Sequence, residues 1–122
     1  MKKSIMIAAL FSFAVMTPNV WAKSDAALVK EAKANVVTIA QAKKLKDETG
    51  VTLTGQIVRQ LQVQGDEFEL KDKTGSIVVE IDDDLWIPLS LKAGDKVRIL
   101  GEVDTHRTKL TDIEAVHVER VK

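Results

Sequence analysis

Apolar residues recur at every second position in several segments after residue 50, which is the period of β-strands. The first segment, 51–63, carries Thr or Gln at most of the alternate positions, which predicts a long, half-buried strand. Gly55 interrupts this strand and indicates a bend or bulge. Shorter segments follow at 68–70, 77–81 and 97–103, separated by the turn sequences at 65–66, 72–75 and 93–95. The apolar positions that we expect to face the core of the domain are Val51, Leu53, Ile57, Leu61, Val63, Phe68, Leu70, Ile77, Val79, Ile81, Val97, Ile99 and Val103.

A fifth strand is predicted over residues 109–118, where the alternation changes face part-way. Its first apolar residues, Ile113 and Ala115, have odd numbers, whereas the next two, Val116 and Val118, have even numbers. A β-bulge or a barrel corner adds one residue to a strand and so shifts this parity.

The segments before residue 50 have helical character. Thr38 precedes Gln41 by three residues, the spacing of a capping box, and apolar residues then recur at helical intervals. This pattern predicts a short helix over 39–47. Residues 23–35 are rich in Lys and Ala with few strongly apolar residues, so we expect a loosely held N-terminal extension with at most a frayed helix.

One helix followed by five strands predicts a mainly β domain over residues 36–122. The long bent first strand and the non-strand segment after the third strand favour a five-stranded Greek-key barrel, the OB-fold, preceded by a short N-terminal helix. A different five-stranded meander or sandwich is the alternative with the same strand pattern.

Residues 1–22 have the layout of a secretory signal peptide. Lys2 and Lys3 precede an uncharged, mostly apolar run over 4–16, and the segment ending at Ala22 fits a cleavage site. The apolar run is shorter than the roughly 20 residues that span a bilayer, which argues against the alternative of a membrane anchor. We therefore predict cleavage after Ala22, export across the inner membrane, and a periplasmic protein with no membrane insertion.

Composition narrows the classes of ligand. The 122-residue chain has 18 Lys and Arg, 18 Asp and Glu, and no Cys, so loss of Lys2 and Lys3 leaves a small acidic excess and a fold without disulfides. Phe68 and Trp86 are the only aromatic residues after the predicted signal. Single-strand nucleic-acid sites on OB-folds combine a basic groove with aromatic stacking platforms. The composition therefore argues against nucleic acid as a partner.

No catalytic constellation stands out in the sequence. The chain has no Cys or Tyr, and Ser76 lacks the Gly-x-Ser-x-Gly setting of a nucleophile. His106 can pair with Asp104 or Asp112, but a surface histidine beside acids is more often simply solvated. We therefore expect a protein that is not an enzyme and needs no cofactor.

Three consecutive carboxylates, Asp82, Asp83 and Asp84, form a candidate metal site at the end of the third predicted strand. Hard cations such as calcium take several oxygen ligands. The competing explanation is a solvated turn, because consecutive residues of a strand cannot all face one ion.

The outward face of the first predicted strand is the candidate ligand surface. Thr52, Thr54, Gln56 and Gln60 make it polar and uncharged, which suits sugar hydroxyls or a peptide backbone. Thr is also common in strands because of its β-propensity alone. Trp86 can stack on a sugar ring if it is exposed, and belongs to the core if it is buried.

Several motifs together also have a recognisable order and spacing. These are a helix lead-in, an L-x-G-x-I-V run, a D-x-x-G turn whose following strand ends in Ile-Asp, a tryptophan, and a G-E-V-D segment, at 37–43, 53–58, 72–82, 86 and 101–104. Over residues 36–118 the chain resembles the bacterial OB-fold (BOF) family, the small periplasmic stress-tolerance proteins of the YgiW/YdeI type. The resemblance implies an OB barrel, a periplasmic location and a role in tolerating envelope or chemical stress, with no established catalytic residue.

From these features we expect a non-enzymatic periplasmic stress-tolerance protein, most simply a monomer. Its OB-fold surface would bind an envelope glycan, a peptide or a periplasmic protein. The alternative is a protein that binds cations or cationic peptides through its acidic loops.

Overall fold

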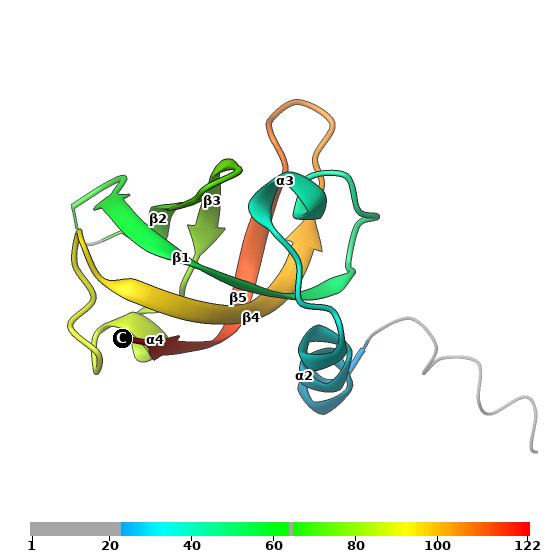
Figure 1. Ribbon diagram of the computed structural model, residues 1–122, viewed down its shortest axis with the longest axis horizontal. Helices are drawn as coiled ribbons and strands as arrows, with labels where there is room; N and C mark the ends of the chain where they lie inside the picture. Colours follow the sequence, from blue (N-terminus) through cyan, green and yellow to red (C-terminus); the bar gives the residue numbers. More distant parts are fainter. Residues whose placement is uncertain (1–22, 64) are drawn as a thin grey trace, which may run out of the picture.

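A computed structural model describes residues 23–63 and 65–122 (Figure 1). The predicted signal peptide, 1–22, lies outside the described residues. The helices of the described part are α2 (Asp25–Ala34), α3 (Ile39–Ala42) and α4 (Asp83–Trp86), and its strands are β1 (Gly50–Gln60), β2 (Glu67–Asp72), β3 (Gly75–Glu80), β4 (Lys96–Asp104) and β5 (Asp112–Arg120). No helix within the described part of the chain has the length and apolar character needed to cross a membrane.

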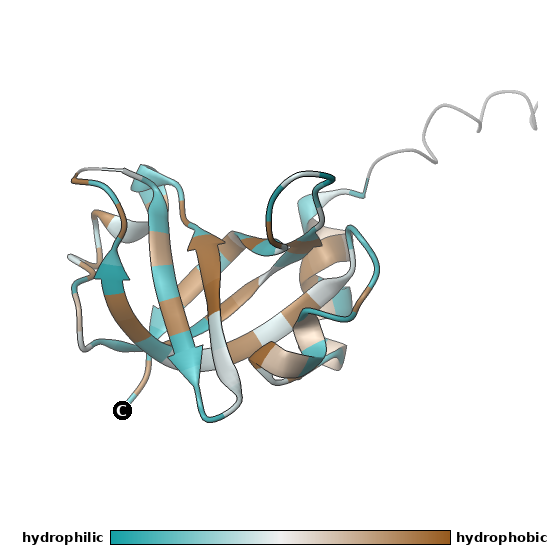
Figure 2. Cartoon of the chain, turned by 90° about the horizontal axis from the view of Figure 1, so that it is seen from above, coloured by the Kyte–Doolittle hydropathy of each residue, from teal (hydrophilic) through white to brown (hydrophobic). Residues whose placement is uncertain are grey.

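The five strands close into a barrel in the order β1-β2-β3-β5-β4. The long strand β1 pairs with β4 through its first half and with β2 through its second half, and β3 closes the barrel by pairing in parallel with β5. This is the five-stranded Greek-key barrel that the sequence predicts. Figure 2 shows the apolar and polar residues alternating along its strands.

A register shift in β1 bends the strand and changes which residues face the core. Ile57 pairs with Leu70, and Arg59 pairs with Glu69, which is adjacent to Leu70 on β2. Val58 is therefore an extra residue on β1. Beyond this bulge the odd positions leave the core, and Val63 is 92% exposed. The expectation that the inward face of β1 continues to Val63 is therefore wrong, because a bulge reverses the parity of a strand.

The predicted bulge in the fifth strand is confirmed. Leu100 of β4 opposes His117, whereas Gly101 opposes Ala115, so Val116 is the extra residue on β5. Of the other predicted inward residues, Leu61 lies beyond the β1 bulge and is only half-buried. The rest are buried and form the core of the barrel together with three residues of β5, Ile113, Ala115 and Val118: Val51, Leu53, Ile57, Phe68, Leu70, Ile77, Val79, Ile81, Val97, Ile99 and Val103.

Two glycines permit close contact between paired strands. A Cβ atom on Gly55 would lie 2.5 Å from the carbonyl oxygen of Lys71, and one on Gly101 would lie 2.5 Å from that of Glu114. Only glycine fits at these points without displacing the neighbouring backbone. Gly55 therefore marks a close approach of β1 and β2, whereas the register shift of β1 lies three residues further on, at Val58.

Helix α2 is a packed element, and the expectation of a loosely held extension over 23–35 is wrong. Ser24 caps the helix by accepting a hydrogen bond from the amide of Ala27 (3.1 Å). Leu28 and Ala32, one turn apart, are both buried against the barrel. They reach the barrel backbone because Gly50 leaves room, where a Cβ atom would lie 3.0 Å from Leu28. Two apolar residues on one face thus suffice to dock the helix.

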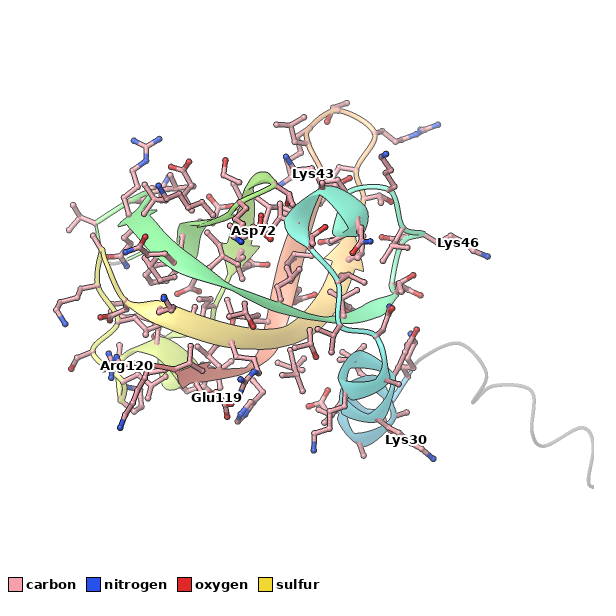
Figure 3. The ribbon with its side chains drawn as sticks, in the orientation of Figure 1. Lys30, Lys43, Lys46, Asp72, Glu119 and Arg120 are labelled. Carbon is pink, nitrogen blue, oxygen red and sulfur yellow. The ribbon has the colours of Figure 1, made fainter. Side chains whose placement is uncertain are left out.

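Helix α3 begins with the predicted capping box. The amide of Gln41 donates to the Thr38 hydroxyl (3.1 Å), and the Gln41 side chain accepts from the amide of Thr38 (2.9 Å). The helix ends at Ala42 rather than near residue 47. Asp72, labelled to the left of α3 in Figure 3, accepts a hydrogen bond from the amide of Ile39 (2.9 Å) and so ties the helix to the β2–β3 turn.

Candidate functional site

The residues predicted to form a polar face on β1 do not share one surface. Thr52 is only 5% exposed, and its hydroxyl donates to the carbonyl oxygen of Ala32 in α2 (2.7 Å). The expectation that Thr52 faces solvent is wrong, because α2 covers it. Thr54 and Gln56 are exposed, and Gln56 donates to the carbonyl oxygen of Gly94 (3.2 Å).

Gln60 lies beyond the bulge and faces the other way. It opposes the buried Phe68 in the ladder, and its side chain donates to the carbonyl oxygen of Gly65 (2.6 Å). Residues directly opposite each other in a ladder share a face, so Gln60 points to the side that Thr54 and Gln56 avoid. The bulge therefore divides the predicted ligand surface.

Trp86 is half-buried at one end of the barrel. Its ring meets Phe68 edge-on, with ring centroids 5.6 Å apart and an interplanar angle of 69°. It packs against the core cluster, and its buried indole Nε1 has no hydrogen-bond partner in the described part of the chain. Of the two alternatives for Trp86, the structure has the core arrangement.

Asp82, Asp83 and Asp84 are all exposed at the start of α4. Within residues 23–63 and 65–122, they do not bring their carboxylates together as a ligand set. The group whose potential ligand atoms all lie within 4.8 Å of one another consists instead of Asp104, His106 and Asp112. From the sequence, we expect at most a pair of His106 with either Asp104 or Asp112, and no group of three ligands.

Four glutamates form a row across four strands on the outside of the barrel. Glu67 of β2 pairs with Glu80 of β3, Glu80 with Glu114 of β5, and Glu114 with Glu102 of β4. Paired residues share a face, and neighbouring strands lie about 4.7–4.9 Å apart, so each carboxylate has a like charge beside it. We refer to Glu67, Glu80, Glu114 and Glu102 as the acidic belt.

Proton affinities within the acidic belt reflect this crowding. Burial raises the pKa of Glu80, Glu102 and Glu114 above the ordinary value of a glutamate, and the charge of neighbouring carboxylates raises each pKa further. Asp112 contributes to the raised pKa of Glu80 and Glu114, and Asp104 contributes to that of Glu102 and Glu114. Like charges opposite each other destabilise a sheet, so the fold itself gains nothing from the belt.

A cleft of about 460 Å³ adjoins the acidic belt. We call it the acidic cleft, because carboxylates dominate its lining: Asp25, Glu48, Asp82, Asp84, Glu102 and Glu114. Lys23 also lines it, and its ammonium group is held by the Glu31 carboxylate (2.5 Å) and the carbonyl oxygen of Glu48 (2.6 Å). The negative charge of the acidic cleft is therefore only partly compensated.

A second cleft, of about 670 Å³, lies over β2, β3 and the β4–β5 loop, and we call it the strand cleft. Leu61, Val78 and Leu110 give it an apolar component, and Leu110 is 88% exposed. Arg59 and Glu69 form an ion pair on its wall, with Nε 2.9 Å from Oε1. OB-folds use this region of the barrel to bind oligonucleotides and oligosaccharides.

Comparisons with known proteins agree with this architecture. The model of the family described as bacterial OB fold (BOF) protein matches residues 16–120. The chain belongs to the BOF family. Among the relatives of this BOF protein is the calcium-regulated OB-fold protein CarO of Pseudomonas aeruginosa, 38% identical over 82 residues, which cover 66% of this chain and 69% of CarO.

Protein YgiW of Escherichia coli K12 is a second relative of this BOF protein, 41% identical over 70 residues, which cover 57% of this chain and 52% of YgiW. The solved structure of E. coli YgiW matches with a TM-score of 0.64 and 36% identity, over 71% of this chain and 90% of that one. An OB domain from Methanosarcina mazei matches with a TM-score of 0.58 at 14% identity, over 72% of this chain and 84% of that one, and shows the fold alone. The resemblance to the BOF family and the OB-fold are therefore both confirmed.

Proposed function

We propose that this BOF protein is a non-enzymatic binding module whose acidic belt and acidic cleft bind a cationic ligand, a basic peptide. The acidic belt carries the proposal: three consecutive strand pairs each place two glutamates side by side. Such pairs cost stability in the free protein, and a bound polycation would offset that cost. The export signal predicted over 1–22 and the stress-tolerance role implied by the family belong to the same proposal, with the ligand encountered in the periplasm.

The linear arrangement of the belt favours a peptide over a single ion. Four carboxylates on successive strands extend over roughly 14 Å, three strand spacings. Within the described residues, the belt does not gather three ligand atoms within 4.8 Å, as an ion would require. A peptide with several Lys or Arg side chains can instead contact the carboxylates one after another, and the adjoining acidic cleft extends the same surface.

The test is the binding of a labelled Lys- and Arg-rich peptide, followed by fluorescence anisotropy. The double variant Glu80→Gln/Glu114→Gln should weaken binding roughly tenfold, because each lost surface charge pair contributes at most about 1 kcal/mol. The matched control Glu69→Gln/Glu119→Gln removes the same charge from ion pairs with Arg59 and Arg98 outside the belt. Equal losses for the two double variants would show attraction by net charge alone and would overturn the proposal.

The strand cleft supports a second candidate function, the binding of an uncharged envelope glycan. Its exposed Leu110 and adjacent polar side chains lie on the face that OB-folds use for oligosaccharides. Titration with soluble glycan fragments, monitored by amide chemical shifts, should move the resonances of β2 and β3 and leave those of the acidic belt residue Glu102 unchanged. Shifts spread over the whole barrel, or none at all, would exclude this function.

A further inference from the structure

We propose that Asp104, His106 and Asp112 form a binding site for a divalent transition-metal ion such as zinc at the base of the β4–β5 loop. The three side chains come from the end of β4, the start of the loop and the start of β5. The site includes none of the four glutamates of the acidic belt and does not depend on the proposed function. In Figure 1 the loop projects beyond the ends of β4 and β5.

The distances between the potential ligand atoms fit one small ion. His106 Nε2 lies 3.2 Å from Asp112 Oδ1 and 3.7 Å from Asp104 Oδ2, and all three ligand atoms lie within 4.8 Å of one another. Zinc binds His nitrogen and carboxylate oxygen at about 2.0–2.2 Å, so two ligands of a tetrahedral ion lie roughly 3.3 Å apart. Small side-chain rotations would therefore place all three atoms around one centre.

The backbone holds two of these carboxylates together without help from an ion. Asp104 and Asp112 are directly opposite each other as the last pair of the β4–β5 ladder. The amide of Thr105 donates to the Asp47 carboxylate (2.8 Å), which fixes the chain between Asp104 and His106. Two acids directly opposite each other in a ladder repel and destabilise the sheet, so a cation bound between Asp104 and Asp112 would relieve this repulsion.

The three side chains are buried to different degrees, from Asp104, the most exposed, to Asp112, the most buried. The exposed fraction is 39% for the side chain of Asp104, 23% for His106 and 11% for Asp112. Three protein ligands with one open side leave a position for water or a further ligand, as in open zinc sites. Lys109 approaches the other oxygen of Asp112, with Nζ 3.9 Å from Oδ2, and leaves Oδ1 free to face His106.

The donor set favours a transition metal over calcium. Imidazole nitrogen combined with carboxylate oxygen suits zinc and other transition metals, whereas calcium takes six to eight oxygen ligands. The carboxylates of the acidic belt add negative charge around the site and would raise the local concentration of divalent cations.

The two histidines of the chain provide an internal comparison. Zinc is titrated into the purified protein while the Hε1 signals of both imidazoles are followed by NMR. The His106 signal should move and saturate at one zinc per chain. His117 is exposed, and within residues 23–63 and 65–122 it forms an ion pair with one carboxylate, that of Glu119 (3.6 Å), so its signal should move little and without saturation. An equal, unsaturated response of both signals would overturn the proposal.

Substitutions separate the metal site from a simple ion pair of His106 with the two aspartates. His106→Gln and Asp104→Asn should each weaken zinc binding at least about tenfold. Even the mutation of a residue that only hydrogen-bonds to a metal ligand lowers metal affinity by about that factor. His117→Gln should change it by no more than roughly twofold. Circular dichroism of each metal-free variant checks its folding, and Asp104→Asn is the safer variant because the Asp104 side chain is more exposed than that of His106. Unchanged zinc affinity in folded His106→Gln, or a calcium response of His106 equal to that of zinc, would show that the site is only an ion pair.

Discussion

Replacing Glu114 by Gln should stabilise the protein at neutral pH, which is unusual for a strand residue. Glu114 stands in the middle of the acidic belt, with Glu102 and Glu80 as its partners on either side. Burial, and then the charges of Asp104, Asp82 and Asp112, raise the pKa of Glu114 above its ordinary value of 4.5. The folded protein therefore binds this proton more tightly than the unfolded chain does.

The sign of the pH dependence follows from that difference. Protonation of Glu114 favours the folded state fully below the unfolded pKa, and this contribution is lost as the pH rises through the folded value. At neutral pH the charged carboxylate instead opposes folding. Glutamine removes the charge at every pH, so the gain should be present at pH 7 and should largely disappear near pH 4.

The magnitude comes from two like-charge pairs at the surface. Two unit charges about 6 Å apart repel by roughly 0.7 kcal/mol in water, and cross-strand pairs contribute about 0.2–1 kcal/mol each. The Glu114 carboxylate loses part of its hydration in the folded protein, but the residue as a whole is exposed, so solvent screening keeps each term in this range. The free energy of unfolding should rise by about 1 kcal/mol, which corresponds to about 4–8 °C in Tm for a domain of this size.

Thermal unfolding followed by circular dichroism measures the effect at pH 7 and pH 4, in low salt and in 1 M salt, where the Debye length is only about 3 Å. Glu119→Gln is the control, with opposite sign. The hydrogen bond from Arg98, followed by that from His117, lowers the pKa of Glu119, so its charge favours the folded state above the unfolded pKa and Glu119→Gln should bring no gain at pH 7. Glu119 lies near the far end of β5 (Figure 3). Destabilisation by Glu114→Gln at pH 7, or a gain that 1 M salt leaves unchanged, would refute the reasoning.

Four further substitutions, one of them a control, test the packing by urea unfolding. Thr52→Val should lower the free energy of unfolding by about 1 kcal/mol, because the Thr52 hydroxyl donates a hydrogen bond to α2. The control Thr54→Val, on the exposed side of β1, should change it by less than about 0.5 kcal/mol. Equal effects of the two substitutions would mean that α2 does not dock as described. Gly101→Ala should cost about 1–3 kcal/mol, since the added Cβ would lie 2.5 Å from a carbonyl oxygen of β5, and a neutral result would show that the two strands can separate there. Phe68→Ala should cost about 3–5 kcal/mol, because the ring is fully buried and contacts Trp86, and a loss below that range would mean that the end of the barrel collapses to fill the space.

Strand alternation and the capping box could be predicted because both depend on residues close in sequence. The side chains of Ile77, Val79 and Ile81 face the core simply because they alternate, and the reciprocal bonds of Thr38 and Gln41 span three residues. The extra residue in β5 was equally accessible, since a bulge leaves a parity change in the sequence itself. These features need no knowledge of what packs against them.

The docking of α2 could not be predicted in the same way, because it depends on two distant segments. Strand alternation alone places Thr52 on the solvent side, but α2, whose Ala32 stands 20 positions earlier, covers it. Leu100, its partner on β4, was the available signal: an apolar residue on the outward side of a strand, buried in the structure, indicates that something covers that face. The prediction of one polar surface on β1 is wrong for two reasons. Helix α2 covers Thr52, and the bulge at Val58 turns Gln60 to the other face of the strand.

The acidic belt was invisible in the sequence for a related reason. Glu67, Glu80, Glu102 and Glu114 are each a single acid in a different segment, at least 12 positions from the next, and only the strand register makes them neighbours. The three consecutive aspartates at 82–84 attract attention in the sequence, yet they are exposed at the start of α4. Closing the barrel converts dispersed charges into adjacent ones, and each such pair costs stability wherever no cation compensates it. The carboxylates that the strand pairs hold together are for this reason better candidates for binding than those that are merely consecutive.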